Sequence, residues 1–191
     1  DVSGAIALGG ASITITGNIT AANATALAAL TAGVVTATAS DTAANLAGMT
    51  IGASDVISMT VTAGAVTAAN LNTANGLGAG VLNASAATSI TGTASALATL
   101  KAAVDAGEVT IAANVAVTIS DTPTLTQLAT IDAMTTGAVS YTSVSGAIAD
   151  LLSSAYVTGS VNVTVTGGAT ITQLFTLDGL TSGTLSYTVS D

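Results

Sequence analysis

Apolar and polar residues alternate along several short segments of this chain, as they do in strands with one buried face. In Val161–Val165 (VNVTV), the three valines would point to one side of a strand and the polar residues to the other. Ser12–Thr16 and Ile57–Val61 show the same alternation. Between such segments, apolar residues recur at helical spacing, as at Leu97 and Leu100, which predicts short helices with one apolar face.

Two types of unit repeat along the chain. Thr122–Tyr141 (TPTLTQLATIDAMTTGAVSY) resembles Gly168–Tyr187 (GATITQLFTLDGLTSGTLSY), and Thr20–Asp41 is a third copy of this type. The second type contains the run VSGAIA, at Val2–Ala7 and again at Val144–Ala149, and each run leads to a strand. Self-similarity of this kind is the sequence signature of repeat architectures.

The chain therefore divides into one array of alternating units. Their predicted boundaries are 1–17, 18–41, 42–63, 64–92, 93–121, 122–143, 144–167 and 168–191. A helix and a strand in about 23 residues cannot close a core alone, so the units must stack. The prediction is an α/β fold, an elongated solenoid of about eight coils with a parallel β-sheet. Its core should contain Leu27, Leu128, Leu174 and Leu177.

The polar positions of the strands predict an exposed ladder of hydroxyl groups on the other face of the sheet. Its expected members are Thr14, Thr16, Thr36, Thr38, Thr60, Thr62, Thr118, Thr142, Thr164, Thr166 and Thr188. A regular threonine row suits a repetitive ligand such as ice or a polysaccharide. Threonine is also common on the solvent side of ordinary strands.

Composition excludes some partners. The 191 residues carry a formal net charge of −9, and Lys101 is the only basic side chain, so we expect no nucleic-acid partner. Polar residues interrupt every apolar run before about 18 residues, so we expect no membrane span. Aromatic residues make up 2% of the chain, which leaves the core to Ala, Val, Ile and Leu.

Candidate chemistry is sparse. The chain has no His and no Cys, so neither a Ser–His–Asp triad nor the usual zinc site can form, and we predict no catalytic, cofactor-binding or metal residues. Asp41 and Asp121 follow strand ends and are expected to cap the next helix. Asp105 and Glu108 form a close acidic pair, expected to lie at an exposed turn with a Lys101–Asp105 ion pair. These features predict that the protein is not an enzyme.

The strings SDTAANLAGM (Ser40–Met49) and TQLATIDAMTTGAVSYT (Thr126–Thr142) resemble repeats in very long exported proteins of cyanobacteria and proteobacteria. Such proteins are often RTX-associated or similar to S-layer proteins and adhesins. The resemblance implies an extracellular or cell-surface location. It also implies calcium binding in a parent protein, but the nonapeptide GGxGxDxxx is absent from this chain, so no calcium site carries over.

The expected function is therefore a structural repeat module of a large extracellular bacterial surface protein: a fibre, surface layer, matrix or adhesin stalk. The alternative is a module that binds ice or a polysaccharide through the threonine ladder. Neither terminal unit has the polar cap that a repeat array needs. We therefore expect the partners to be further repeats of the same parent chain, or identical subunits placed end to end.

Overall fold

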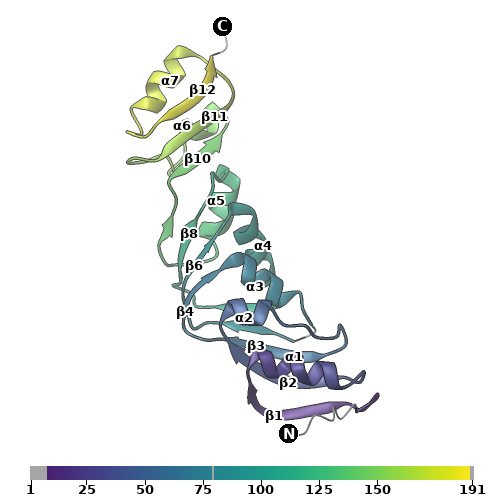
Figure 1. Ribbon diagram of the computed structural model, residues 1–191. Helices are drawn as coiled ribbons and strands as arrows, with labels where there is room; N and C mark the ends of the chain where they lie inside the picture. Colours follow the sequence, from purple (N-terminus) through teal and green to yellow (C-terminus); the bar gives the residue numbers. More distant parts are fainter. Residues whose placement is uncertain (1–7, 79, 190–191) are drawn as a thin grey trace.

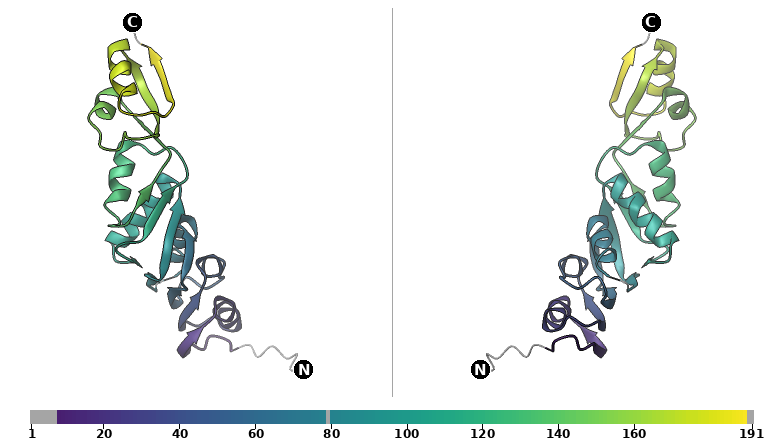
Figure 2. Two further views of the ribbon diagram at one scale, coloured as in Figure 1. Left: turned by 90° about the vertical axis from the view of Figure 1, so that its left-hand side faces the viewer. Right: turned by 90° about the vertical axis from the view of Figure 1, so that its right-hand side faces the viewer.

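The computed structural model describes residues 8–78 and 80–189, in which short strands alternate with short helices along an elongated molecule (Figure 1). The first and last described strands lie at opposite ends, and the two turned views agree on this arrangement (Figure 2). The predicted run Val2–Ala7 and the pair Ser190–Asp191 lie outside the described residues.

Helices and strands share the chain, but the strict helix–strand order that the repeats predict is interrupted where β3 is followed by β4, β5 by β6, β7 by β8 and β9 by β10. The helices are α1 (Ala21–Leu30), α2 (Ala43–Ala47), α3 (Ala68–Asn75), α4 (Ala94–Asp105), α5 (Leu125–Asp132), α6 (Ile148–Leu152) and α7 (Ile171–Asp178). The strands are β1 (Ile13–Ile19), β2 (Val35–Asp41), β3 (Val56–Val61), β4 (Gly64–Thr67), β5 (Leu82–Ala84), β6 (Ala87–Gly92), β7 (Val109–Ile111), β8 (Ala116–Ile119), β9 (Val139–Ser140), β10 (Ser143–Gly146), β11 (Asn162–Ala169) and β12 (Leu185–Val189).

The prediction of one solenoid with a single sheet is wrong, because the described strands form three separate sheets. Their orders are β1-β2-β3-β5-β7, β4-β6-β8-β9 and β10-β11-β12. Every strand pair that these sheets contain is parallel. The described chain is thus α/β and similar to Rossmann-like domains in its alternation of parallel strands with helices. Its strand orders follow the chain without reversal.

The first break between sheets lies between β3 and β4. The five-stranded sheet includes β3, which ends at Val61, and the four-stranded sheet begins with β4 at Gly64. Gly64 has a φ of 152°, a value that residues with a side chain rarely adopt, so the chain bends here. Strand alternation alone does not show this bend, which is why the sequence predicted one sheet.

The second break lies near Pro123, the only proline in the chain. The carbonyl oxygen of Pro123 accepts a hydrogen bond from the Ser145 N–H at 2.8 Å, but proline has no N–H to donate in return. Of the backbone pairing, an isolated bridge between Thr124 and Ser145 joins these described segments, and side-chain hydrogen bonds link Thr122 with Ser143 and Ser145 with Pro123. The four-stranded sheet therefore ends at β9, and β10 starts a new sheet with β11.

Threonine begins most of the helices. In six of the seven described helices, the N-cap threonine accepts a hydrogen bond from the backbone N–H three residues later. These residues are Thr20, Thr42, Thr67, Thr93, Thr124 and Thr170. In α5 and α7, Gln127 and Gln173 complete a capping box by accepting from the backbone of the cap residue. The repeated threonine therefore fixes where each helix starts.

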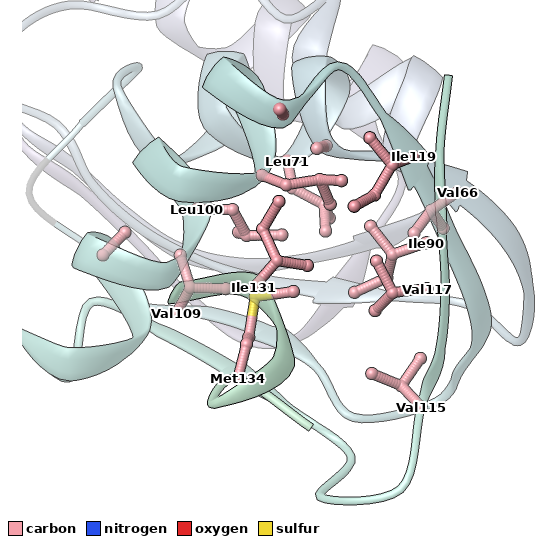
Figure 3. Close-up of a cluster of buried hydrophobic side chains, with 14 of the residues drawn as sticks. Val66, Leu71, Ile90, Leu100, Val109, Val115, Val117, Ile119, Ile131 and Met134 are labelled. Atoms are coloured by element: carbon pink, nitrogen blue, oxygen red, sulfur yellow. The ribbon is translucent and has the colours of Figure 1, made fainter. Parts of the chain in front are cut away.

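Small aliphatic side chains form the core between helices and strands. Figure 3 shows Leu71, Leu100 and Ile131 from the helices beside Ile90 and Val117 from the strands. Helix positions that face the strands include fully buried alanines, such as those of α1 and α3, so these helices lie close to the strands. No helix in residues 8–78 and 80–189 has the length and apolarity needed to cross a membrane.

The predicted burial of the repeat leucines is confirmed at three of four positions. Leu128 and Leu177 are completely buried and Leu174 is 8% exposed. Leu27 is only partly buried, although it packs against the core.

Replacing Leu128 with alanine should lower the free energy of unfolding by about 2–4 kcal/mol, because a buried leucine leaves a cavity behind. Leu180→Ala is the matched control, since Leu180 is 40% exposed and its truncation should cost less than about 1 kcal/mol. Urea titration followed by circular dichroism measures both. A loss at Leu128 below about 0.5 kcal/mol would show that this helix does not pack as described.

Candidate functional site

A threonine and a glycine two residues later join successive units. The three occurrences are Thr31–Gly33, Thr135–Gly137 and Thr181–Gly183, each between a helix and the following strand. Thr135 Oγ1 donates to the carbonyl oxygen of Val115 at 2.6 Å and accepts from the Gly137 N–H at 2.8 Å. We call this arrangement the Thr-x-Gly junction.

The other two junctions have the same contacts. Thr181 Oγ1 lies 2.6 Å from the Val161 carbonyl oxygen and accepts from the Gly183 N–H at 2.9 Å. Thr31 Oγ1 contacts the carbonyl oxygen of Ala11 and accepts from the Gly33 N–H. In each case the hydroxyl reaches a carbonyl 20 residues earlier, so it ties one unit to the unit before it.

Glycine is required because two backbone segments nearly touch at the junction. A Cβ atom on Gly137 would lie 2.4 Å from the Asn114 carbonyl oxygen, and one on Gly183 would lie 2.2 Å from that of Val161. Both distances are well below van der Waals contact, so a side chain would force the two segments apart. These glycines therefore allow the close passage of the two segments.

The prediction that Asp41 and Asp121 cap the next helix is wrong. Thr42 and Thr124 are the N-caps of those helices. Asp41 instead accepts a hydrogen bond from the N–H of Ala21, the first residue of the preceding helix α1, at 3.2 Å. In the same way, Asp121 accepts from the N–H of Ala94 at the start of α4, at 2.8 Å.

Asp41 also has hydrogen-bond partners in the next unit. Its Oδ1 accepts from the Asn45 side chain at 2.7 Å and from the Thr42 N–H at 2.8 Å. These hydrogen bonds, that from Asn45 above all, hold the pKa of the Asp41 carboxyl below its ordinary value of 3.8. The carboxylate therefore stabilises the contact between two units in its charged form.

Asp55 also connects two units, and the sequence analysis did not identify it. It is 3% exposed, and its Oδ1 accepts from the Val35 N–H at 2.8 Å while its Oδ2 accepts from the Gly52 N–H at 2.7 Å. At the corresponding point of other units, a backbone carbonyl accepts this bond, as Ala138 does from Val117. Asp55 thus replaces a backbone acceptor, and no local pattern in the sequence signals that replacement.

The remaining acidic residues with candidate chemistry lie at the surface. Asp105 forms an ion pair with Lys101 at 2.6 Å, as expected from their spacing. Glu108 accepts from the Asn75 side chain at 2.9 Å. Within the part of the chain that the structure describes, no three acidic, His or Cys side chains gather where they could hold a metal ion.

The structure separates the predicted threonine ladder into short pieces. Most of the eleven residues are exposed, and Thr38 and Thr60 are partly buried. Only Thr14 and Thr36 stand directly opposite each other across a strand pair. Thr118 belongs to a different row, Thr67–Thr91–Thr118–Ser140, which crosses the four-stranded sheet. The others pair with Ser, Asn or Gly, precede a bulge, or lie outside the strands, as Thr62 and Thr142 do.

Several exposed apolar side chains gather at the end formed by α7 and β12. Ile171, Leu174, Phe175, Leu185, Tyr187 and Val189 line a shallow groove together with Asp178. Five large apolar side chains are exposed in this unit, namely Ile171, Phe175, Leu180, Tyr187 and Val189. Phe175 is 76% exposed and Ile171 is 63% exposed. We call these five residues the C-terminal face.

The earlier copy of this unit shows part of the same face covered, although Ala129, the counterpart of Phe175, is exposed. Tyr141, the counterpart of Tyr187, is partly buried, and its hydroxyl donates to the Tyr156 carbonyl oxygen at 3.0 Å. The two tyrosine rings meet edge to face, with centroids 6.4 Å apart. Burial raises the pKa of the Tyr141 hydroxyl, as expected for a ring beneath the next unit. Met134, the counterpart of Leu180, is buried.

Comparison with family models, curated proteins and solved structures gives no match to this chain.

Replacing Thr135 with valine should cost about 1–3 kcal/mol, because it leaves the Val115 carbonyl and the Gly137 N–H without their partner. Thr176→Val is the matched control. The Thr176 hydroxyl is exposed and bonds only within its own helix, so its loss should change stability by less than about 0.5 kcal/mol. Equal losses of stability at the two positions in a denaturant titration would show that the Thr135 hydroxyl does not hold neighbouring units together.

The stabilisation from Asp41 should depend on pH. A lowered pKa in the folded state means that this stabilisation is present above pH 3.8 and is lost as the pH falls through the folded-state pKa. The thermal midpoint of the native chain should therefore exceed that of Asp41→Asn near pH 6, and the difference should shrink toward about pH 2. A difference that stays constant over this range would show that the charge of Asp41 does not contribute.

Proposed function

We propose that this chain is a structural module of a large exported bacterial surface protein, acting as a spacer in a fibre, surface layer, matrix or adhesin stalk. One observation carries the proposal. The most buried polar side chains of the repeats, Thr181 and Asp55, bond to backbone groups of neighbouring units.

The arrangement of strands supports a mechanical role. Neighbouring strands stack along the long axis of the molecule, so their hydrogen bonds are loaded one after another when the ends are pulled (Figure 1). In a series arrangement the weakest junction sets the load that the module can bear. The Thr-x-Gly junction adds a side-chain hydrogen bond and a close backbone contact at such points.

The extracellular location and the absence of enzymatic activity are parts of this proposal. The location rests on the resemblance to repeats of exported surface proteins. The absence of activity rests on the contacts of the acidic side chains. Asp41, Asp121 and Asp55 bind backbone groups, and Asp105 pairs with Lys101.

Single-molecule force spectroscopy tests the spacer role. The chain has no native Cys, so a cysteine introduced at each end provides an unambiguous handle. Unfolding should proceed in a series of steps of about 7 nm, the extended length of about 22 residues. Thr135→Val should lower the force of one step, and Thr176→Val should leave all steps unchanged.

Two results would contradict the proposal. One is extension without measurable resistance, which would mean that the junctions bear no load. The other is a single event that releases the whole chain, because this is the behaviour of one cooperative globule.

A further inference from the structure

We propose that Asn75 deamidates in the folded protein, and that the carboxylate formed there weakens the contact between two neighbouring units. Asn75 is the only asparagine in the chain that precedes a glycine, Gly76. The other asparagines precede Ile, Ala, Leu, Thr or Val, whose side chains crowd the backbone nitrogen that has to react. This modification is separate from the proposed structural role and does not depend on it.

The reaction needs only the chain and water. The backbone nitrogen of Gly76 loses its proton and attacks Cγ of the Asn75 side chain, which closes a succinimide ring. The side-chain nitrogen takes up a proton and leaves as ammonia. Water then opens the ring to the carboxylic acid of aspartate or isoaspartate, which ionises at neutral pH. Glycine favours the ring because it has no Cβ and its backbone adopts conformations that other residues avoid.

Asn75 lies at a place that water and hydroxide reach. It is the last residue of α3, and both Asn75 and Gly76 have exposed surface. Asn75 also lines an open hollow of about 330 Å³ between α3 and α4, together with Thr99 and Glu108. Hydroxide is the base that removes the Gly76 proton, and water is the reactant that opens the ring. Both steps therefore have the solvent that they need.

Hydrogen bonds hold both reacting groups while α3 is intact. The Gly76 N–H donates to the carbonyl oxygens of Asn72 and Thr73, each at 3.1 Å. The Asn75 side-chain amide donates to Glu108 Oε2 at 2.9 Å. Attack therefore requires the last turn of α3 to open, and the end of an eight-residue helix opens locally more easily than the whole unit unfolds. The folded chain should react more slowly than the unfolded chain, but it should react.

Deamidation replaces an attraction between two units with a repulsion. Asn75 donates to a carboxylate of the next unit, and its product places a second carboxylate beside Glu108. The new charge also lies at the C-terminal end of α3, where the helix dipole disfavours a negative group. Lys101, the only basic side chain of the protein, pairs with Asp105. The chain therefore has no second basic side chain to offset the repulsion.

Peptide mapping by mass spectrometry tests the site in the full chain. During incubation at mildly alkaline pH, Asn75 should convert to the acid while the other asparagines remain amides. Gly76→Ala is the matched control, because the backbone at Gly76 is helical and the added Cβ would make only ordinary contacts at 3.6 Å. Conversion at Asn75 should be lost in this variant over the time in which half of the native chain converts.

Substitutions of Glu108 test the hydrogen bond that restrains Asn75. Glu108→Ala removes the acceptor and should raise the rate of conversion about threefold to tenfold, the factor expected for one hydrogen bond. Glu108→Gln is its matched control, because the Gln side-chain oxygen can still accept from the Asn75 amide. Its rate should stay close to that of the native chain. Equal rates in Glu108→Ala and Glu108→Gln would contradict this restraint.

Asn75→Asp carries the product from the start and tests its effect on the contact between units. In a urea titration it should raise the equilibrium constant of unfolding about tenfold. Combining it with Glu108→Gln should restore most of the loss, because the Gln amide can donate to the new carboxylate. No conversion at Asn75 in the folded chain, over the time in which the urea-unfolded chain converts completely, would overturn the inference. Equal conversion in Gly76→Ala, or an Asn75→Asp variant as stable as the native chain, would overturn it as well.

Discussion

The contact on which the rest of the structure depends is the close passage of two backbone segments where one unit meets the next. A unit with one short helix and few short strands cannot bury its apolar residues alone, so its stability comes from its neighbours. At three junctions a threonine hydroxyl bonds to a carbonyl 20 residues earlier. The two backbone segments pass so closely there that only glycine, which has no side chain, fits between them. The hydrogen bonds of these polar residues thus add stability that the small apolar core of one unit cannot provide alone.

The composition of the core explains why this contact has to be so close. With aromatic residues at 2% of the chain, the space between helices and strands is filled by alanine, valine, leucine and isoleucine, including completely buried alanines such as Ala24 and Ala68. Small side chains let the two layers approach each other and keep each unit thin. A thin unit has a large end surface relative to its volume, so a unit without a neighbour exposes apolar residues such as Leu180, whose counterpart Met134 is buried.

Much of the local structure could be predicted from the sequence. Alternation located strands near Ser12, Ile57 and Val161, and helical spacing predicted that Leu128 and Leu177 would be buried. The division into three sheets could not be predicted from the alternation of apolar and polar residues. It depends on a bend at Gly64 and on Pro123, which has no N–H group to donate a hydrogen bond. The contacts of Asp41 with the preceding helix and of Asp55 with Val35 depend on which residues stacking brings together. The threonine ladder was predicted from strand faces alone, and the actual registers divide it among three sheets.

Native-state hydrogen exchange of single amides tests the central role of the junctions most directly. The N–H groups of Gly33, Gly137 and Gly183 donate to the threonine hydroxyls and are only partly buried. If the junctions hold the units together, these amides should be protected as strongly as the strand amides of Val117 and Val163, because all of them open only when units separate. Exchange of the three glycine amides at the rate of exposed turns, with the strands still protected, would contradict this account.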